Sequence, residues 1–193
     1  MPEPAKPPEQ PVEDDGLLFG CLLNGDGTAK LVGWSEVESW QESKAPLWVH
    51  LDRDSPRVQR WLRDKSGLTG ATVEALLAEE TRPRVFRGKR GFVTILRGVN
   101  TNPDADPEDM VAMRMWSDGQ RVITIRQKRL MTPRDILAQL LETENGPKNA
   151  SEVYERLIHR ITERMAVIIA SFDARLDDIE ESLDLSQATK LRR

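Results

Sequence analysis

The stretch from Asn149 to Arg193 constrains the fold more than any other part of the sequence, because it contains neither glycine nor proline. Those two residues are the strongest helix breakers, and Asn145-Gly146-Pro147 supplies them just upstream. Asn149 and Glu152 stand three residues apart, an asparagine variant of the capping box that begins helices. A helix of roughly 44 residues at ~1.5 Å per residue would be ~66 Å long. A domain of this size is narrower, so we expect the helix to project from it.

Apolar residues recur along this helix at steps of three and four. The series is Ile158, Ile161, Met165, Ile168, Phe172, Leu176, Ile179 and Leu183. These spacings form a heptad-like stripe with one stutter between Met165 and Leu176. A narrow stripe on a projecting helix favours packing against a helix of another subunit or of an adjoining segment. The alternative, a helix lying along its own sheet, suits the first turns, where Val153 and Leu157 widen the stripe.

The sequence before residue 149 alternates between strand and helix signals. Expected strands cover 17–23, 29–33, 47–51, 85–86, 92–96, 110–116 and 122–125, and expected helices cover 56–65, 69–78 and 132–141. The turn Asn24-Gly25-Asp26-Gly27 predicts a hairpin between the first two strands, and the last four strands predict an antiparallel meander. Because several strands are apolar runs, we expect helices on both faces of the sheet. The expected core positions are Trp48, Leu51, Phe92, Ile95, Val122, Ile123 and Ile125.

Composition excludes several classes of protein. The 28 Lys and Arg against 32 Asp and Glu give the 193 residues a net charge of −4. A single cysteine, Cys21, excludes an internal disulfide framework and a CxxC motif. The longest uncharged apolar run, Met165 to Phe172, has eight residues, whereas a membrane span needs ~20. The proline-rich, acidic residues 1–15 resemble a disordered tail rather than a signal peptide.

Neither catalysis nor nucleic-acid binding has clear sequence support. The common motifs for acyl transfer, zinc peptidases and phosphate-binding loops are missing, so no enzyme is expected. Two basic clusters comprise Arg82, Arg84, Arg87, Lys89, Arg90 and Arg97, and Arg121, Arg126, Lys128 and Arg129. The chain is acidic overall and its aromatic residues form no stacking platform. We therefore expect these cations to pair with neighbouring acids, without a nucleic-acid partner.

The late part of the long helix is strongly acidic. Six carboxylates fall within twelve residues, opposed only by Arg175. Five of them are linked by helical steps of three, four or seven and form the acidic face: Asp173, Asp177, Glu180, Glu181 and Asp184. Divalent cations prefer such oxygen ligands, and a bound ion would relieve the repulsion between like charges; a solvated face without an ion is the alternative. His50, Cys21 and His159 are softer candidate zinc ligands, but no two have ligand spacing in the sequence.

Three segments together resemble a known family. Trp48-Val49-His50-Leu51-Asp52, then Glu79-Glu80-Thr81-Arg82-Pro83-Arg84, then the long helix are similar to the cytoplasmic domain of CorA-type divalent metal ion transporters. The Glu-Glu-Thr-Arg-Pro-Arg version resembles the ZntB zinc-transporting branch. The likeness covers roughly residues 17–193. The Gly-Met-Asn pore signature of the family is absent from this sequence.

The resemblance implies a fold, a location and an assembly. The expected fold is an α/β/α sandwich with a mixed, largely antiparallel sheet and a projecting C-terminal helix. Residues 1–15 would be a tail, 16–148 the cytoplasmic domain and 149–193 a stalk leading toward a membrane domain. Five copies would form a funnel on the cytoplasmic face of the bacterial inner membrane. The domain would regulate or gather a divalent cation, with zinc and magnesium both left open; the alternative is a soluble α/β module that oligomerises and binds no metal.

Overall fold

A computed structural model describes residues 15–42, 45–79, 82–100, 102, 105 and 109–191, with side chains described within the last helix as far as Glu181. The tail expected over residues 1–15 lies outside the described residues except for Asp15. The strands are β1 (Leu17–Leu23), β2 (Ala29–Val32), β3 (Leu47–Asp52), β4 (Arg84–Arg87), β5 (Phe92–Gly98), β6 (Val111–Ser117) and β7 (Arg121–Arg126). The helices are α1 (Trp34–Glu38), α2 (Pro56–Asp64), α3 (Gly70–Leu77), α4 (Thr132–Ala138), the π-helical turn η1 (Gln139–Thr143) and α5 (Ala150–Leu191).

The strands form one seven-stranded sheet in the order β2-β1-β3-β7-β6-β5-β4. Strands β1 and β2 make the predicted hairpin, and β4 to β7 make the predicted antiparallel meander. Strand β3 runs antiparallel to β1 but parallel to β7, with Val49 opposite Ile123. This parallel pair joins the hairpin to the meander, so the sheet is mixed and largely antiparallel, as the sequence analysis predicts.

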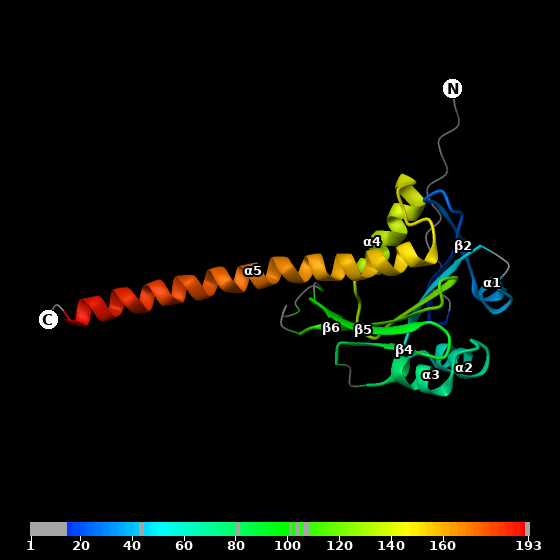
Figure 1. The fold of residues 1–193 in the computed structure, drawn as a ribbon, viewed down its shortest axis with the longest axis horizontal. Coiled ribbons are helices and arrows are strands. Elements are labelled where there is room, and N and C mark those ends of the chain that lie inside the picture. Colours follow the sequence, from blue (N-terminus) through cyan, green and yellow to red (C-terminus); the bar gives the residue numbers. More distant parts are fainter. Residues whose placement is uncertain are drawn as a thin grey trace, which may run out of the picture.

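Helices cover both faces of the sheet, which confirms the expected layering (Figure 1). On one face α1, α2 and α3 pack with the sheet around a core that includes Val37, Trp61, Leu76, Val49, Ile95 and Trp116. On the other face α4 and the beginning of α5 pack around Phe19, Trp48, Met113, Val122, Leu137 and Leu157. Side chains of central strands are buried on both faces, which explains their nearly continuous apolar sequences.

The helix starts follow local signals with two exceptions. Ser55 accepts a hydrogen bond from the Val58 amide at the start of α2, and Thr69 accepts one from Thr72 at the start of α3. The predicted Thr132 cap is wrong, because Met131 holds the N-cap position of α4 without a side-chain cap bond. Helix α1 was not expected from the sequence. This five-residue helix is too short for its spacing to show a period, although Glu36 accepts a bond from the Gly33 amide at its start.

Six of the seven expected core residues are buried, and Phe92 is the exception. Its side chain is 51% exposed. Phe92 begins β5 opposite Arg87 of the edge strand β4, and the two line an open cleft beside Tyr154 at the beginning of α5. No described helix covers this corner of the sheet closely enough to bury the ring. A period of two indicates on which face of the sheet a side chain lies, but it does not show how near that residue lies to the edge of the sheet. The prediction that Phe92 is buried was therefore wrong.

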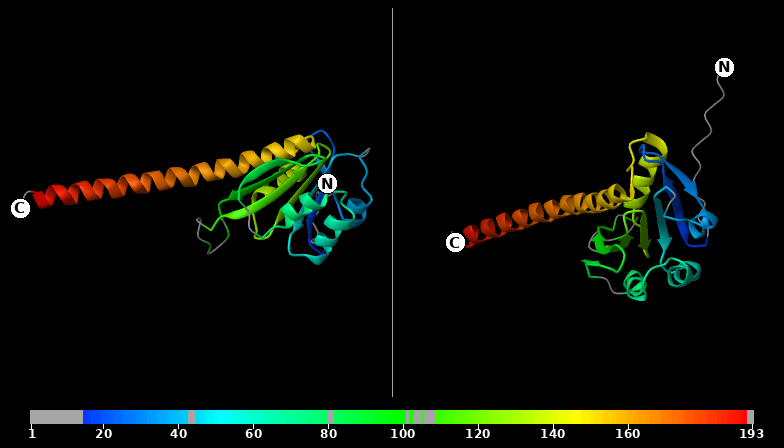
Figure 2. Two further views of the ribbon diagram at one scale, coloured as in Figure 1. Left: turned by 60° about the horizontal axis from the view of Figure 1, so that its bottom comes forward. Right: turned by 45° about the vertical axis from the view of Figure 1, so that its right-hand side comes forward.

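Helix α5 leaves the body of the protein as a single straight rod (Figures 1 and 2). Its 42 residues correspond to a length of ~63 Å at ~1.5 Å per residue. The helix crosses one face of the sheet first and then extends beyond it. The projecting helix expected from the glycine-free and proline-free sequence is therefore confirmed.

Candidate functional site on the projecting helix

Side chains fix the start of α5 firmly. The Asn149 Oδ1 atom accepts a hydrogen bond of 2.9 Å from the Glu152 amide, as the predicted cap requires. In a standard capping box Glu152 would accept a hydrogen bond from the backbone amide of the cap residue, Asn149. Here its Oε2 accepts instead from the amide of the preceding residue, Lys148, at 2.9 Å. Arg156 donates to the Asn145 carbonyl at 2.6 Å, which ties the first turns to the loop before the helix.

The first turns of α5 pack tightly on the sheet. Ala150, Val153, Leu157 and Ile161 are buried, at the i, i+3, i+4 spacing of one helical face. The Tyr154 hydroxyl makes a hydrogen bond with Thr94 of β5. At the point of departure, Arg164 donates to Asp135 Oδ2 of α4 at 2.5 Å and to Thr132 Oγ1 at 3.2 Å. These contacts set the direction in which the rest of the helix projects.

Beyond Met165, which still packs against the core, the apolar stripe of α5 is half-buried or exposed. Leu176 is 56% exposed and Ile179 54% exposed. The exposed apolar surface is wider than the predicted stripe, since Val167 and Ile169 are also exposed. Ile169 could have been found from the sequence, because it lies four residues after Met165 and three before Phe172. Exposed apolar residues grouped along one helix indicate an interaction surface.

The acidic face lies on the same projecting part of α5. Asp173, Asp177, Glu180 and Glu181 are all exposed, and the Asp184 side chain lies outside the described residues. Within the described part of a single chain, no three His, Cys, Asp or Glu side chains are placed to hold a metal ion together. The cation site therefore stays a prediction, and it would need carboxylates from neighbouring copies or water molecules to complete the ligand set.

The three softer candidate ligands lie in different surroundings. Cys21 is fully buried in β1, and burial raises the pKa of its thiol to about 12. A zinc ligand must be a thiolate, which this environment disfavours. His159 lies on the exposed surface of α5, where its Nε2 is 3.2 Å from Glu163 Oε1. His50 is buried in β3 beside Phe19. The zinc assignment of these residues stays a prediction without a shared ligand geometry.

His50 belongs to a buried hydrogen-bond network around Thr124. The Thr124 hydroxyl donates to the Val49 carbonyl at 3.0 Å and accepts from Trp48 Nε1 at 3.0 Å. Because that hydroxyl has one hydrogen, the 2.9 Å contact with His50 Nδ1 requires the hydrogen to be on Nδ1. Burial, reinforced by the charges of Arg126 and Arg134, lowers the pKa of His50 to about 3. The ring is therefore neutral at physiological pH.

The pKa of His50 predicts a pH dependence of stability. Below pH ~6.5 the unfolded chain protonates this histidine, whereas the folded chain stays neutral down to about pH 3. The free energy of unfolding should therefore decrease as the pH is lowered from about 6.5 to about 3. His50 contributes up to ~1.4 kcal/mol of this decrease per pH unit. His50→Asn removes the titrating group, so urea unfolding from pH 7 to pH 4 should show a shallower decline in the variant. Parallel curves would show that the histidine is not held neutral.

Comparison with known proteins assigns the family. Residues 43–193 match the family described as CorA-like Mg2+ transporter protein. The chain belongs to the CorA family. The match includes both the sheet from β3 onward and the whole of α5. Among the described residues of this CorA-family chain, no helix combines the length and apolar character that a membrane crossing requires.

Relatives in the CorA family carry the names of cation transporters. The chain is 40% identical over 177 residues to the divalent cation transporter CmaX of Pseudomonas aeruginosa, a match that covers 91% of this chain and 53% of CmaX. It is 28% identical over 172 residues to the zinc transport protein ZntB of Pectobacterium atrosepticum, covering 89% of this chain and 51% of ZntB. The chain thus spans about half the length of these curated relatives. That it is not an enzyme stays a prediction.

Solved structures agree with this CorA-family assignment. The structure of full-length CmaX matches with a TM-score of 0.79 at 41% identity, covering 88% of this chain and 52% of that one. The ZntB cytoplasmic domain of Vibrio parahaemolyticus has a TM-score of 0.71 at 24% identity, covering 86% of this chain and 65% of that one. The latter identity shows the fold alone. The expected fold, which the sequence resemblance placed with the CorA and ZntB cytoplasmic domains, is therefore confirmed.

Proposed function

We propose that the chain is the cytoplasmic part of an oligomeric divalent-cation transporter and that α5 is the stalk that leads toward its membrane part. The observation that carries this proposal is the division of α5 into an anchored beginning and an exposed remainder. The anchored turns pack on the sheet through Val153, Leu157 and Ile161. The remainder presents an apolar stripe and an acidic face to solvent. Membership of the CorA family and the names of the relatives support the assignment.

The apolar stripe supports assembly of several copies. Exposed apolar side chains on a rod that stands clear of its own domain gain stability by packing against an equivalent rod. Ile168 and Phe172 are only half-buried in the single chain, and Leu176 and Ile179 are more exposed still. A homo-oligomer places these stripes together, and five copies around a central axis at the cytoplasmic face of the inner membrane is the arrangement we propose.

The acidic face supports a role in gathering cations. Assembly would bring the carboxylates of neighbouring stalks together along the axis. A ring of carboxylates attracts cations, raises their local concentration and can bind them without any chemical step. Carboxylate oxygens suit magnesium and related hard ions, and zinc would also accept them, although it prefers nitrogen and sulfur. The domain would thereby form the vestibule of the transporter and regulate entry of zinc, magnesium or a related ion.

A transport assay on a chimera tests this function. The chain replaces the corresponding N-terminal part of Pseudomonas aeruginosa CmaX, and uptake of zinc and of magnesium into proteoliposomes is measured. The chimera should take up at least one of these ions, and changing Asp173, Asp177, Glu180 and Glu181 to their amides should slow initial uptake at low salt by on the order of tenfold. A folded, oligomeric chimera that takes up neither ion, while native CmaX takes up one, would favour the alternative of an oligomerising module without a cation role.

A further inference from the structure

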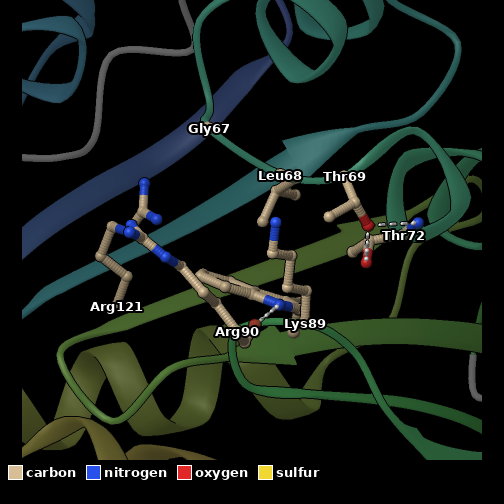
Figure 3. Close-up of a pocket in the computed structure, with 8 residues that line it drawn as sticks. Gly67, Leu68, Thr69, Thr72, Lys89, Arg90 and Arg121 are labelled. Carbon is tan, nitrogen blue, oxygen red and sulfur yellow. Dashed lines mark hydrogen bonds between the residues drawn. The ribbon is translucent and has the colours of Figure 1, made fainter.

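A cavity lined by no residue of α5 carries a separate inference. It has a volume of about 240 Å³ and lies between the start of α3, the β4–β5 turn and the start of β7 (Figure 3). Its cationic lining consists of Lys89, Arg90 and Arg121, and Trp116 also lines it. No described Asp or Glu side chain lines it. In a chain with a net charge of −4, such a lining indicates a pocket for an anion. We call it the basic pocket.

Arg121 is a rigid part of the basic pocket. Its Nη1 donates to the Ser66 carbonyl at 2.9 Å, and its Nε and Nη2 each donate to Asp118 Oδ2 at 3.3 Å. The guanidinium lies between two indole rings, 5.0 Å from the centre of Trp116 and 5.3 Å from that of Trp40. Three of its five N–H donors are used in these bonds, which leaves two without an acceptor among the described residues. Asp118 offsets its charge, so the excess positive charge comes from the other two cations.

Lys89 and Arg90 are held at the pocket by the backbone of their turn. The Gly88 amide donates to the Gly91 carbonyl at 2.9 Å, and Trp116 Nε1 donates to the Arg90 carbonyl at 2.9 Å. Gly91 has φ +84°, and a Cβ there would lie 2.1 Å from the Ser117 carbonyl oxygen, so the turn requires glycine. Contrary to the sequence expectation, neither the Lys89 nor the Arg90 side chain pairs with an acid among the described residues.

The third side of the basic pocket is the start of α3. Thr69 and Thr72 line it, and the Thr72 amide is used by the Thr69 hydroxyl. The positive end of the α3 dipole at this terminus favours negative charge. It adds to the attraction of Lys89 and Arg90, whose side chains have no acidic partner among the described residues.

We propose that the basic pocket binds a phosphoryl group, either as inorganic phosphate or as the phosphate of a small organic molecule. The cations Lys89 and Arg90, which have no acidic partner among the described residues, the spare donors of Arg121 and the threonine hydroxyls match a dianion with several acceptor oxygens. The volume is below the ~300–1,000 Å³ of pockets for drug-sized ligands, which excludes a large ligand. This proposal does not depend on cation transport, because none of these residues lies on α5.

The test is a titration followed by amide NMR on the 193-residue chain. Inorganic phosphate is added at pH 7.5 and constant ionic strength, and adenosine monophosphate is added in a second series. Saturable shifts are expected for the amides of the lining residues Leu68, Thr69 and Arg90 and for the Trp116 indole N–H. Lys89→Gln with Arg90→Gln should weaken affinity at least about tenfold, because each change removes a charged hydrogen-bond donor. Both side chains are exposed, so the variant should fold normally.

A matched variant separates specific binding from general attraction. Lys30→Gln with Arg63→Gln removes the same charge from two exposed sites away from the pocket. Affinity in this control should stay within about twofold of the native value. Tighter binding of adenosine monophosphate than of phosphate would identify an organic phosphate, and equal binding would identify the phosphoryl group alone. Non-saturable shifts with both ligands, or equal weakening in both variants, would overturn the proposal.

Discussion

Ile95→Ala should lower the free energy of unfolding by about 2–5 kcal/mol. Ile95 is fully buried in β5, between Arg84 of β4 and Arg114 of β6, and its side chain packs in the core beneath α1, α2 and α3. Removing its outer carbons leaves a cavity that the packed sheet cannot close. Urea unfolding of the native chain and the variant measures the difference.

Val85→Ala is the control for this experiment. Val85 lies on the edge strand β4 and is 65% exposed, so its truncation should change stability by no more than ~0.5 kcal/mol. If Ile95→Ala changed stability as little as Val85→Ala does, β5 could not occupy the place in the core that the sheet order gives it.

Ile168→Glu combined with Phe172→Glu should abolish self-association of the chain. Both side chains lie on the apolar stripe beyond Met165, which still packs against the core, so the change puts two charges into the surface that we expect to be buried between copies. Sedimentation velocity over a wide concentration range should show association of the native chain and a monomer for the variant.

Ala170→Glu with Ala174→Glu adds the same two charges on the opposite side of the helix. Both alanines are exposed, and helical geometry places them ~160–200° from Phe172. This control should associate like the native chain. A native chain that stays monomeric at every concentration, or a control that dissociates equally, would remove the stripe as the contact between copies.

Local sequence signals account for most of the fold. The absence of breakers predicted α5, the Asn-Gly-Asp-Gly turn predicted the β1–β2 hairpin, and the period of two predicted the meander. These features depend on residues that are near each other in the chain. The strand order in the middle of the sheet depends instead on residues that are far apart in the chain. Val49 of β3 pairs with Ile123 of β7, more than seventy residues away. No local pattern specifies that pairing.

The candidate sites show the same division. The stripe and the acidic face repeat along one helix, so a helical period was enough to group their residues. The basic pocket was not predictable, because it unites Arg121 with Lys89 and Arg90, and the sequence analysis placed them in two separate clusters. Trp116, which also lines the pocket, looks in the sequence like any other core residue of a strand. His50 likewise gave no sign of its bond to Thr124, which lies on a partner strand 74 residues away.

Calorimetric titration of magnesium and of zinc tests the central claim, that the projecting helix gathers divalent cations. The titrations use the native chain at a concentration where it associates, a variant with Asp173, Asp177, Glu180 and Glu181 changed to their amides, and a control variant. The control changes Glu42, Glu74, Glu142 and Glu155 to glutamine, all exposed and outside the acidic face. Each variant loses four negative charges, so the two differ only in which carboxylates are removed.

We expect saturable binding of at least one ion to the native chain and to the control. Binding to the acidic-face variant should be at least about tenfold weaker, because in the native chain an ion neutralises nearby carboxylates that otherwise repel one another. Binding should also weaken as salt screens the charges. Identical isotherms for all three proteins would contradict the claim and leave the acidic face as a solvated surface.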